Sequence, residues 1–166
     1  MTDTAALFAR DFDSLTVGDR FVTSGRPVTE SDVVAFAALT GDRHPQHTDV
    51  RWAEGSLFGE RIAHGLLVLS FAVGLVSLDP ERVVALRRVR DAVFKQPVRL
   101  GETIHVDGRI DELAPIDRAL GLVLSTWKVC NDRGSTAVRA RVEVLWRRDR
   151  PAVPDESAYV AGVVPL

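Results

Sequence analysis

The sequence predicts an α+β domain in which a long, curved antiparallel sheet wraps around one apolar helix. Residues 65–78 are apolar on every side apart from Ser70 and Ser77, a pattern typical of a helix surrounded by protein. After this segment the hydrophobic period changes to two, which is typical of half-buried strands. The turn sequence Asn-Asp-Arg-Gly at 131–134 separates the last two such segments, and strands joined by a short turn pair antiparallel. A helix that must be covered and a sheet that can cover it favour this architecture.

Two helices are expected before the apolar one. In "VTESDVVAFAAL", Thr29 can cap a helix, and Asp32, three residues later, completes a variant of the capping box. Gly41 predicts the end of this helix, because glycine adopts the left-handed conformation that often follows a helix. The segment "HTDVRWAEGS" predicts a second, short helix that is capped by Thr48 and ends at Gly55.

Three strands are expected in the second half of the chain. Residues 102–110 divide between an apolar and a polar face. The apolar face carries Ile104, Val106 and Ile110, and the polar face carries Thr103, His105, Asp107 and Arg109. Residues 120–129 and 137–147 follow as long strands. In the last one, alternation places Val138, Ala140, Val142, Val144 and Trp146 on one face and Arg139, Arg141, Glu143 and Arg147 on the other.

Length, charge and cysteine content limit the classes of protein to consider. With 166 residues the chain is expected to form one domain, 1–166, with irregular or partly ordered terminal segments at 1–20 and 148–166. A net charge of −2 provides no general attraction to nucleic acids or anionic membranes. The single Cys130 leaves no internal disulfide, which fits a reducing compartment. The chain shows neither an export signal nor an apolar segment of membrane-spanning length, so a cytoplasmic location is expected.

A cluster of polar and turn-forming residues follows the first predicted helix directly. Asp42, His44, Pro45, His47 and Asp49 fall within eight positions. Ionisable residues usually scatter over a surface, so this cluster is a candidate site, with a plain polar loop as the alternative. Two histidines and a carboxylate could also hold zinc with one open position. Pro45 prevents a regular helix from aligning these ligands and the sequence has no zincin motif, so we expect no metal.

Three segments together resemble the MaoC-like dehydratases, the (R)-specific enoyl-CoA hydratase family. "TGDRHPQHTDVRWA" is similar to the family pattern Gly-Asp-x-Asn-Pro-x-His-x-Asp. "GERIAHGLLVLS" resembles the Ala-His-Gly motif before the central helix, and "FKQPVRLGETI" resembles a Phe-x-x-Pro-Val-x-x-Gly-Asp/Glu strand. The resemblance covers roughly residues 20–145 and implies the hotdog fold, a sheet wrapped around a long helix. It has one departure, because His44 stands where the family usually has asparagine.

The resemblance also implies a reaction. Family members add water reversibly to trans-2-enoyl thioesters and give (R)-3-hydroxyacyl thioesters. Asp42 and His47 match the acid/base pair that holds the water, and the backbone N–H of Gly65 matches the donor to the thioester oxygen. At a helix N-terminus such an N–H has no intrahelical partner. His44 would tune the pair through its charge, which changes near neutral pH.

Cofactors and partners follow from the same resemblance. Water supplies both the hydroxyl group and the proton, so no metal, flavin or nucleotide is expected, and coenzyme A enters only as part of the substrate. The acyl carrier could be coenzyme A or an acyl carrier protein. A lone hotdog sheet exposes a long edge, so we expect a homodimer or a higher homo-oligomer.

The candidate residues also have simpler explanations. Asp42 could follow a helix-ending glycine in an ordinary turn, and His47 could be a solvated loop residue. We expect Asp49 to be a first-turn helix residue that complements the helix dipole. For His64, a partly buried histidine hydrogen bonded at the start of the apolar helix is preferred over a catalytic role. Only the agreement of the three motifs favours a site.

Two other functions remain open at this point. Hotdog proteins include acyl-CoA thioesterases, so hydrolysis is the enzymatic alternative. The replacement at His44 also keeps open a non-catalytic acyl-thioester-binding subunit of a heteromeric dehydratase. Basic residues could meet the phosphates of coenzyme A, but we expect them to form a solvated face. These residues are Arg87, Arg88, Arg90 and Lys95.

Overall fold

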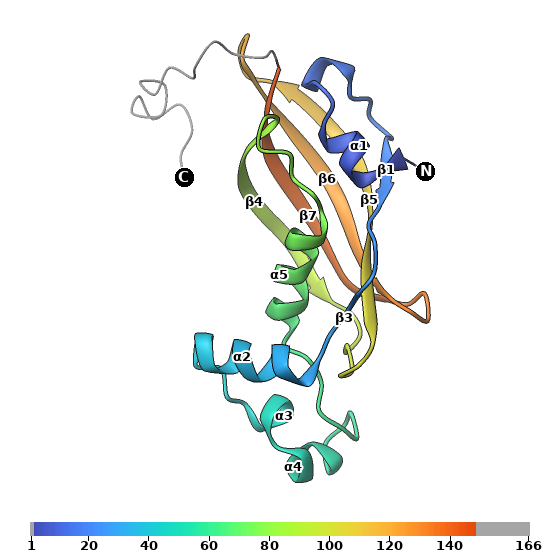
Figure 1. Ribbon diagram of the computed structural model, residues 1–166, viewed down its shortest axis with the longest axis vertical. Coiled ribbons are helices and arrows are strands. Elements are labelled where there is room, and N and C mark those ends of the chain that lie inside the picture. The colour runs from blue at the N-terminus through green and yellow to red at the C-terminus, as the bar shows by residue number, and fades with distance from the viewer. Residues whose placement is uncertain (1, 149–166) are drawn as a thin grey trace.

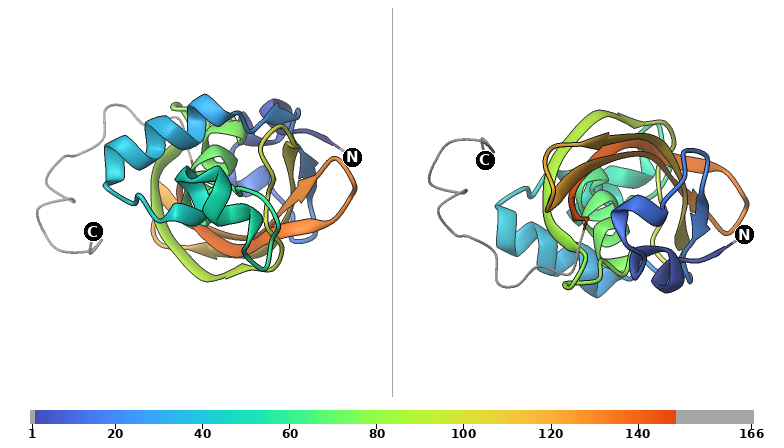
Figure 2. Two further views of the ribbon diagram at one scale, coloured as in Figure 1. Left: turned by 90° about the horizontal axis from the view of Figure 1, so that it is seen from below. Right: turned by 90° about the horizontal axis from the view of Figure 1, so that it is seen from above.

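A curved sheet wraps around helix α5 in the computed structural model, which describes residues 2–148 (Figure 1). The elements in chain order are β1 (Thr2–Asp3), α1 (Thr4–Phe8), the 3-10 helix η1 (Phe12–Ser14), β2 (Arg20–Val22), β3 (Arg26–Pro27), α2 (Glu30–Thr40), α3 (Pro45–Thr48), α4 (Val50–Glu54), α5 (Gly65–Leu75), β4 (Val83–Phe94), β5 (Thr103–Pro115), β6 (Leu120–Asn131) and β7 (Thr136–Arg147). Within the described residues the sheet has seven strands in the order β1-β2-β5-β6-β7-β4, and β3 also pairs with β5. All pairs are antiparallel except β1–β2. Views along the long axis show the strands curling around α5 (Figure 2), so the predicted α+β hotdog architecture is confirmed.

Helix α5 packs one face against the concave side of the sheet. This buried face carries Leu67, Val68 and Ala72. The opposite face carries Leu66, Ser70 and Gly74 at four-residue intervals and is exposed, with 61% of Leu66 accessible to solvent. The helix also ends at Leu75, three residues earlier than expected. The prediction that protein surrounds this helix on every side is therefore wrong for a single chain.

Helices α2, α3 and α4 lie together beyond the N-terminal end of α5 (Figure 1). The predicted capping box of α2 is confirmed: Thr29 Oγ1 accepts the Asp32 N–H at 3.2 Å, and the Asp32 carboxylate accepts the Thr29 N–H at 2.8 Å. Gly41 ends the helix in the left-handed conformation with φ 78°, as predicted. The predicted N-cap of α4 was wrong by one residue, because the side chain of Asp49, and not that of Thr48, accepts a first-turn N–H.

The three predicted strands are confirmed as β5, β6 and β7, and the predicted hairpin turn joins the last two. Glu143 keeps the predicted alternation with Val142 and Val144 but is buried, and it pairs there with Arg87. Strand β4 was not predicted and pairs with β7 at the edge of the sheet. The resemblance implied a strand at "FKQPVRLGETI", and this prediction is wrong for residues 95–102. These residues form turns and an isolated bridge to Ile62.

The N-terminal segment is folded against the sheet, in contrast to the expectation for residues 1–20. Helix α1 and the 3-10 helix place apolar side chains in the main core, namely Leu7, Phe8, Phe12 and Leu15. Trp146 fixes this segment, since its Nε1–H donates to the backbone carbonyl of Arg10 at 3.0 Å. The C-terminal segment was expected at 148–166, and its residues 149–166 lie outside the described residues.

Membrane-spanning helices were also not expected. Among residues 2–148, none of the helices is long and apolar enough to cross a bilayer.

Candidate active site

Asp42 lies in the turn that follows α2. Its Oδ1 accepts the backbone N–H of His44 at 3.3 Å, which is the geometry of an Asx turn. Its backbone carbonyl faces Nε2 of His64 at 3.0 Å. Within the described residues the second carboxylate oxygen has no hydrogen-bond partner, and Asp42 lines a cavity. The turn therefore fixes the backbone of Asp42 and leaves one carboxylate oxygen available to a ligand.

His44 caps the short helix α3. Its Nδ1 accepts the Gln46 N–H at 3.1 Å, and Pro45 occupies the first helical position. This bond requires an unprotonated Nδ1, because a protonated nitrogen cannot accept. Asparagine caps helices through its Oδ1, which occupies the corresponding position on the side chain. The structure thus gives a physical reason why histidine can replace the usual family asparagine here.

His47 presents one ring nitrogen to the cavity. Its Nδ1 lies 2.7 Å from the carbonyl oxygen of Ile62, and since a carbonyl only accepts, Nδ1 carries the hydrogen. In the neutral ring Nε2 is then an acceptor. Burial lowers the pKa of His47 below its ordinary value of 6.5, and the neighbouring His64 and His44 lower it further, while the bond to Ile62 and the charge of Asp42 act in the opposite direction. At neutral pH the uncharged ring, which can act as a base, is therefore favoured.

His64 immediately precedes α5 and is almost completely buried, with 2% of its surface exposed. Its Nε2 meets the Asp42 carbonyl, and its ring stacks on His47 with centroids 3.8 Å apart. The predicted buried, hydrogen-bonded histidine at the helix start is confirmed. Sequence reasoning missed its contact with both site residues, for which the only signal was its place in the Ala-His-Gly motif.

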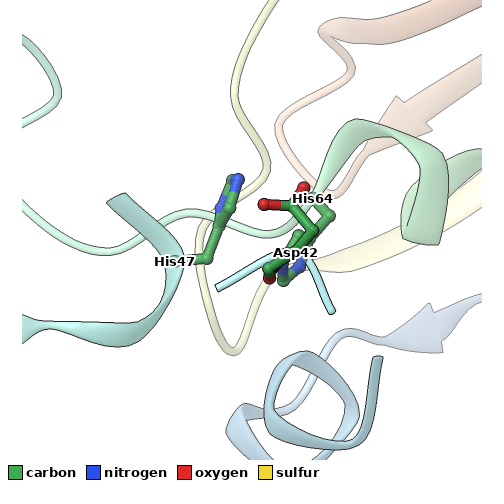
Figure 3. A group of neighbouring side chains, drawn as sticks. All are labelled: Asp42, His47 and His64. Carbon is green, nitrogen blue, oxygen red and sulfur yellow. Dashed lines mark hydrogen bonds between the residues drawn. The ribbon is translucent and has the colours of Figure 1, made fainter. Parts of the chain in front are cut away.

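The side chains of Asp42, His47 and His64 lie close together (Figure 3). One nitrogen or oxygen atom from each lies within 4.8 Å of the other two. A water that bonds two acceptors at about 2.8 Å can bridge such a gap with a near-tetrahedral angle. The described structure shows no direct hydrogen bond between the Asp42 and His47 side chains. The gap is therefore suited to one bridging water.

The same donors were tested as metal ligands. The three residues considered as zinc ligands, Asp42, His44 and His47, do not form one cluster. The cluster contains His64 in place of His44. Two imidazoles on one tetrahedral zinc, at Zn–N distances of about 2.0 Å, have ring centroids about 5 Å apart. The His47 and His64 rings are stacked at 3.8 Å, which is too close for this geometry. The stacked arrangement does not fit a tetrahedral zinc ion.

Gly65 begins α5 beside this cluster. Within the described residues its N–H has no acceptor, as expected for the first residue of a helix. A Cβ at this position would lie 2.6 Å from the ring of Phe94, so only glycine fits without displacing that side chain. The N–H is therefore a free donor at the cavity.

The cavity that these groups line has a volume of about 450 Å³. Its walls are mostly apolar, with Phe58, Ile62, Leu66, Val68, Phe94, Val98 and Val138 among the lining residues. Of the four basic residues considered for coenzyme A phosphates, only Lys95 lines it. An apolar pocket with a few convergent polar groups is typical of a site for a small organic substrate.

The fold and this cavity define a hotdog domain with an aspartate–histidine site. Residues 13–120 match the family described as MaoC like domain, and the chain belongs to that family.

Relatives of known name agree with this assignment. The chain is 39% identical to Protein MaoC of Klebsiella aerogenes over 100 residues, which are 60% of this chain and 30% of that protein. It is 36% identical to a 3-hydroxybutyryl-CoA dehydratase of Methylorubrum extorquens over 107 residues, 63% of this chain and 66% of that protein. The chain thus spans less than a third of the first relative and about two thirds of the second.

Solved structures are similar over most of the chain. A protein from Archaeoglobus described as a monoamine oxidase regulatory protein is 36% identical, with a TM-score of 0.79 over 84% of this chain and 95% of that one. The R-hydratase PhaJ1 from Pseudomonas aeruginosa is 27% identical, with a TM-score of 0.66 over 87% of this chain and 93% of that one.

Proposed function

We propose that this chain catalyses the reversible addition of water to trans-2-enoyl thioesters, giving (R)-3-hydroxyacyl thioesters. The observation that carries the proposal is the closeness of Asp42 and His47 at the cavity, where a carboxylate oxygen of Asp42 and a ring nitrogen of His47 lie within 4.8 Å of each other. The Gly65 N–H is a free donor beside it. Relatives named 3-hydroxybutyryl-CoA dehydratase and (R)-specific enoyl-CoA hydratase support this chemistry.

The proposed mechanism uses one water and returns every proton. Neutral His47 accepts one proton from the water through Nε2, while the Asp42 carboxylate accepts a hydrogen bond from the O–H that remains and stabilises the imidazolium. The water oxygen forms a bond to C3, and the C2–C3 π electrons move toward the thioester oxygen. The Gly65 N–H stabilises the negative charge on that oxygen. His47 then gives its proton to C2, and the enzyme returns to its initial state.

A spectrophotometric assay with crotonyl-CoA tests this function. Hydration removes the conjugated double bond, so the absorbance of the enoyl thioester should fall without release of free thiol. Loss of absorbance with stoichiometric thiol release would identify a thioesterase instead. No change with pure protein at high concentration would contradict hydration and favour the non-catalytic subunit. Parallel assays with crotonyl groups on coenzyme A and on acyl carrier protein would identify the carrier.

We also propose that the chain forms a homodimer or a higher homo-oligomer. The apolar residues Leu66, Leu86, Val89 and Phe94 have exposed fractions between 37% and 61% in the single chain. Leu86 and Val89 pair across the sheet with Val144 and Val142, so they lie on the core side of edge strand β4. This apolar surface is continuous with the core, and we propose that a second copy of the chain buries it.

Light scattering on the pure protein tests the assembly. The wild type should have at least twice the mass of the chain, and Leu86→Glu should shift it toward the monomer. Val17→Glu, at an exposed valine before β2, is the control and should keep the wild-type mass. A stable wild-type monomer that hydrates crotonyl-CoA would contradict the proposal.

A further inference from the structure

His64 has no role in the mechanism above, although it touches both residues of the proposed acid/base pair. We infer that His64 is a positioning residue that holds Asp42 and His47 in place through the neutral tautomer with hydrogen on Nε2. The inference rests on the proposed function, because it assigns His64 an effect on the same reaction.

The contacts of His64 connect the two segments that carry the site. Its Nε2 lies 3.0 Å from the backbone carbonyl of Asp42, which is 22 residues earlier in the chain. Because a carbonyl can only accept, Nε2 must be the donor. The His64 ring stacks on the His47 ring, with centroids 3.8 Å apart and an interplanar angle of 30°. The centroid of the Phe36 ring lies 5.0 Å from that of His64. His64 thus restricts the Asp42 turn by a hydrogen bond and the His47 ring by stacking.

The surroundings of the second ring nitrogen indicate that His64 is neutral. Nδ1 is buried and, within the described residues, has no hydrogen-bond partner. Protonation would create a buried N–H without an acceptor, which costs the full desolvation of that donor. It would also set a positive charge against the His47 ring, which must itself accept a proton in the reaction. The Asp42 carboxylate in the same cluster acts in the opposite direction, but it accepts no hydrogen bond from His64 among the described residues. A neutral ring avoids both costs.

His64 is unlike an ordinary helix cap. It occupies the N-cap position of α5, yet its side chain makes no capping hydrogen bond to the helix. Its polar contact goes to the Asp42 turn instead, and the next residue supplies the free N–H of Gly65. The three groups of the proposed mechanism therefore meet at His64.

Two substitutions separate the hydrogen bond from the rest of the side chain. In His64→Gln the amide can present an N–H at the position of Nε2 and keep the bond to Asp42. The shorter side chain of His64→Asn cannot reach that carbonyl. His105→Asn on β5 makes the same chemical change outside the cluster and serves as the control.

The expected result is a loss in kcat that glutamine rescues. His64→Asn should lower kcat for crotonyl-CoA hydration by about tenfold to hundredfold with KM changed far less, because misplaced catalytic groups slow the chemical step. His64→Gln should stay within about fivefold of wild type, and His105→Asn should be unchanged. Wild-type kcat in His64→Asn, or equal losses in both His64 variants, would overturn the inference. Thermal unfolding of each variant checks that it is folded.

A spectroscopic measurement tests the tautomer without any assay of activity. In ¹⁵N-labelled protein at neutral pH, the imidazole signals of His64 should show a protonated Nε2 and an unprotonated Nδ1. A hydrogen on Nδ1 would overturn the inference. If wild-type protein lacks hydratase activity, the proposed function fails, and this measurement still decides the charge state of His64.

Discussion

The Asp42–His47 pair is best tested by removing each member and then both. Asp42→Asn keeps the shape of the side chain and an Oδ1 that can accept the His44 N–H, so the turn should persist. His47→Ala removes the Nε2 that is proposed to take the proton. General acid–base groups contribute typically about 10² to 10⁴ in rate, which corresponds to about 3 to 5 kcal/mol in the activation free energy. Each single variant should lose kcat in this range.

The double variant should lose little more than the more impaired single variant. Both side chains are proposed to act on one water within a 4.8 Å cluster, and residues that act as a unit give non-additive losses. If they acted independently, the two losses would multiply to about 10⁴ to 10⁸. We expect the double variant to stay within about tenfold of the weaker single variant.

Initial rates of crotonyl-CoA hydration measure these losses. Asp49→Asn is the matched control, because it makes the same substitution at the N-cap of α4 and asparagine caps equally well. The reasoning would be refuted by activity within a few-fold of wild type in either single variant. Fully multiplicative losses in the double variant would also refute the shared-water geometry.

Further predictions concern pH, the family departure and stability. Because burial favours neutral His47, kcat/KM should be flat at neutral pH and fall only below pH 6.5, and a fall centred above 6.5 would contradict this. The charge of Asp42 raises the His47 pKa, so Asp42→Asn should move the fall in kcat/KM to lower pH. His44→Asn should keep the α3 cap, retain or improve activity and change the pH–rate profile, because His44 lowers the pKa of His47, whereas an unchanged profile would refute tuning by this residue. Trp146→Phe removes the donor to the Arg10 carbonyl and should lower the free energy of unfolding by about 1–3 kcal/mol in urea titrations, while an unchanged midpoint would contradict a structural role for this bond.

Local sequence signals predicted the helices and the strands that follow simple rules. The capping box of α2 and the left-handed Gly41 depend only on neighbouring residues, and both were found as predicted. Thr48 and Asp49 can each cap a helix, so the sequence alone could not select the residue that caps α4. Local chemistry narrows the position of a helix start but does not always decide it.

The missed elements have no simple period. Strand β4 contains three register shifts and a residue with φ 53° at Asp91, and these irregularities break the alternation that identifies a strand. In the N-terminal segment, helices of five and three residues are too short for a helical period to emerge. Their apolar residues are buried because of tertiary contacts with the sheet, which no local pattern records.

The candidate site was predictable where its residues are close in sequence. Asp42, His44 and His47 lie within six positions, and a family resemblance identified their pattern. His64 joins them only through the fold, since α5 brings its N-terminal end to the turn after α2. His44 is nearer in sequence, but its Nδ1 accepts the Gln46 N–H and caps α3, so it is not part of the cluster.

The most direct test of the proposed reaction is the structure of its product. Crotonyl-CoA should be incubated with the wild-type protein in D₂O, and the configuration and deuterium content of the product should be determined. The proposed mechanism predicts (R)-3-hydroxybutyryl-CoA with one deuterium at C2, in amounts that Asp42→Asn and His47→Ala greatly reduce. Formation of the (S) product, release of free coenzyme A, or equal yields with the two variants would contradict it.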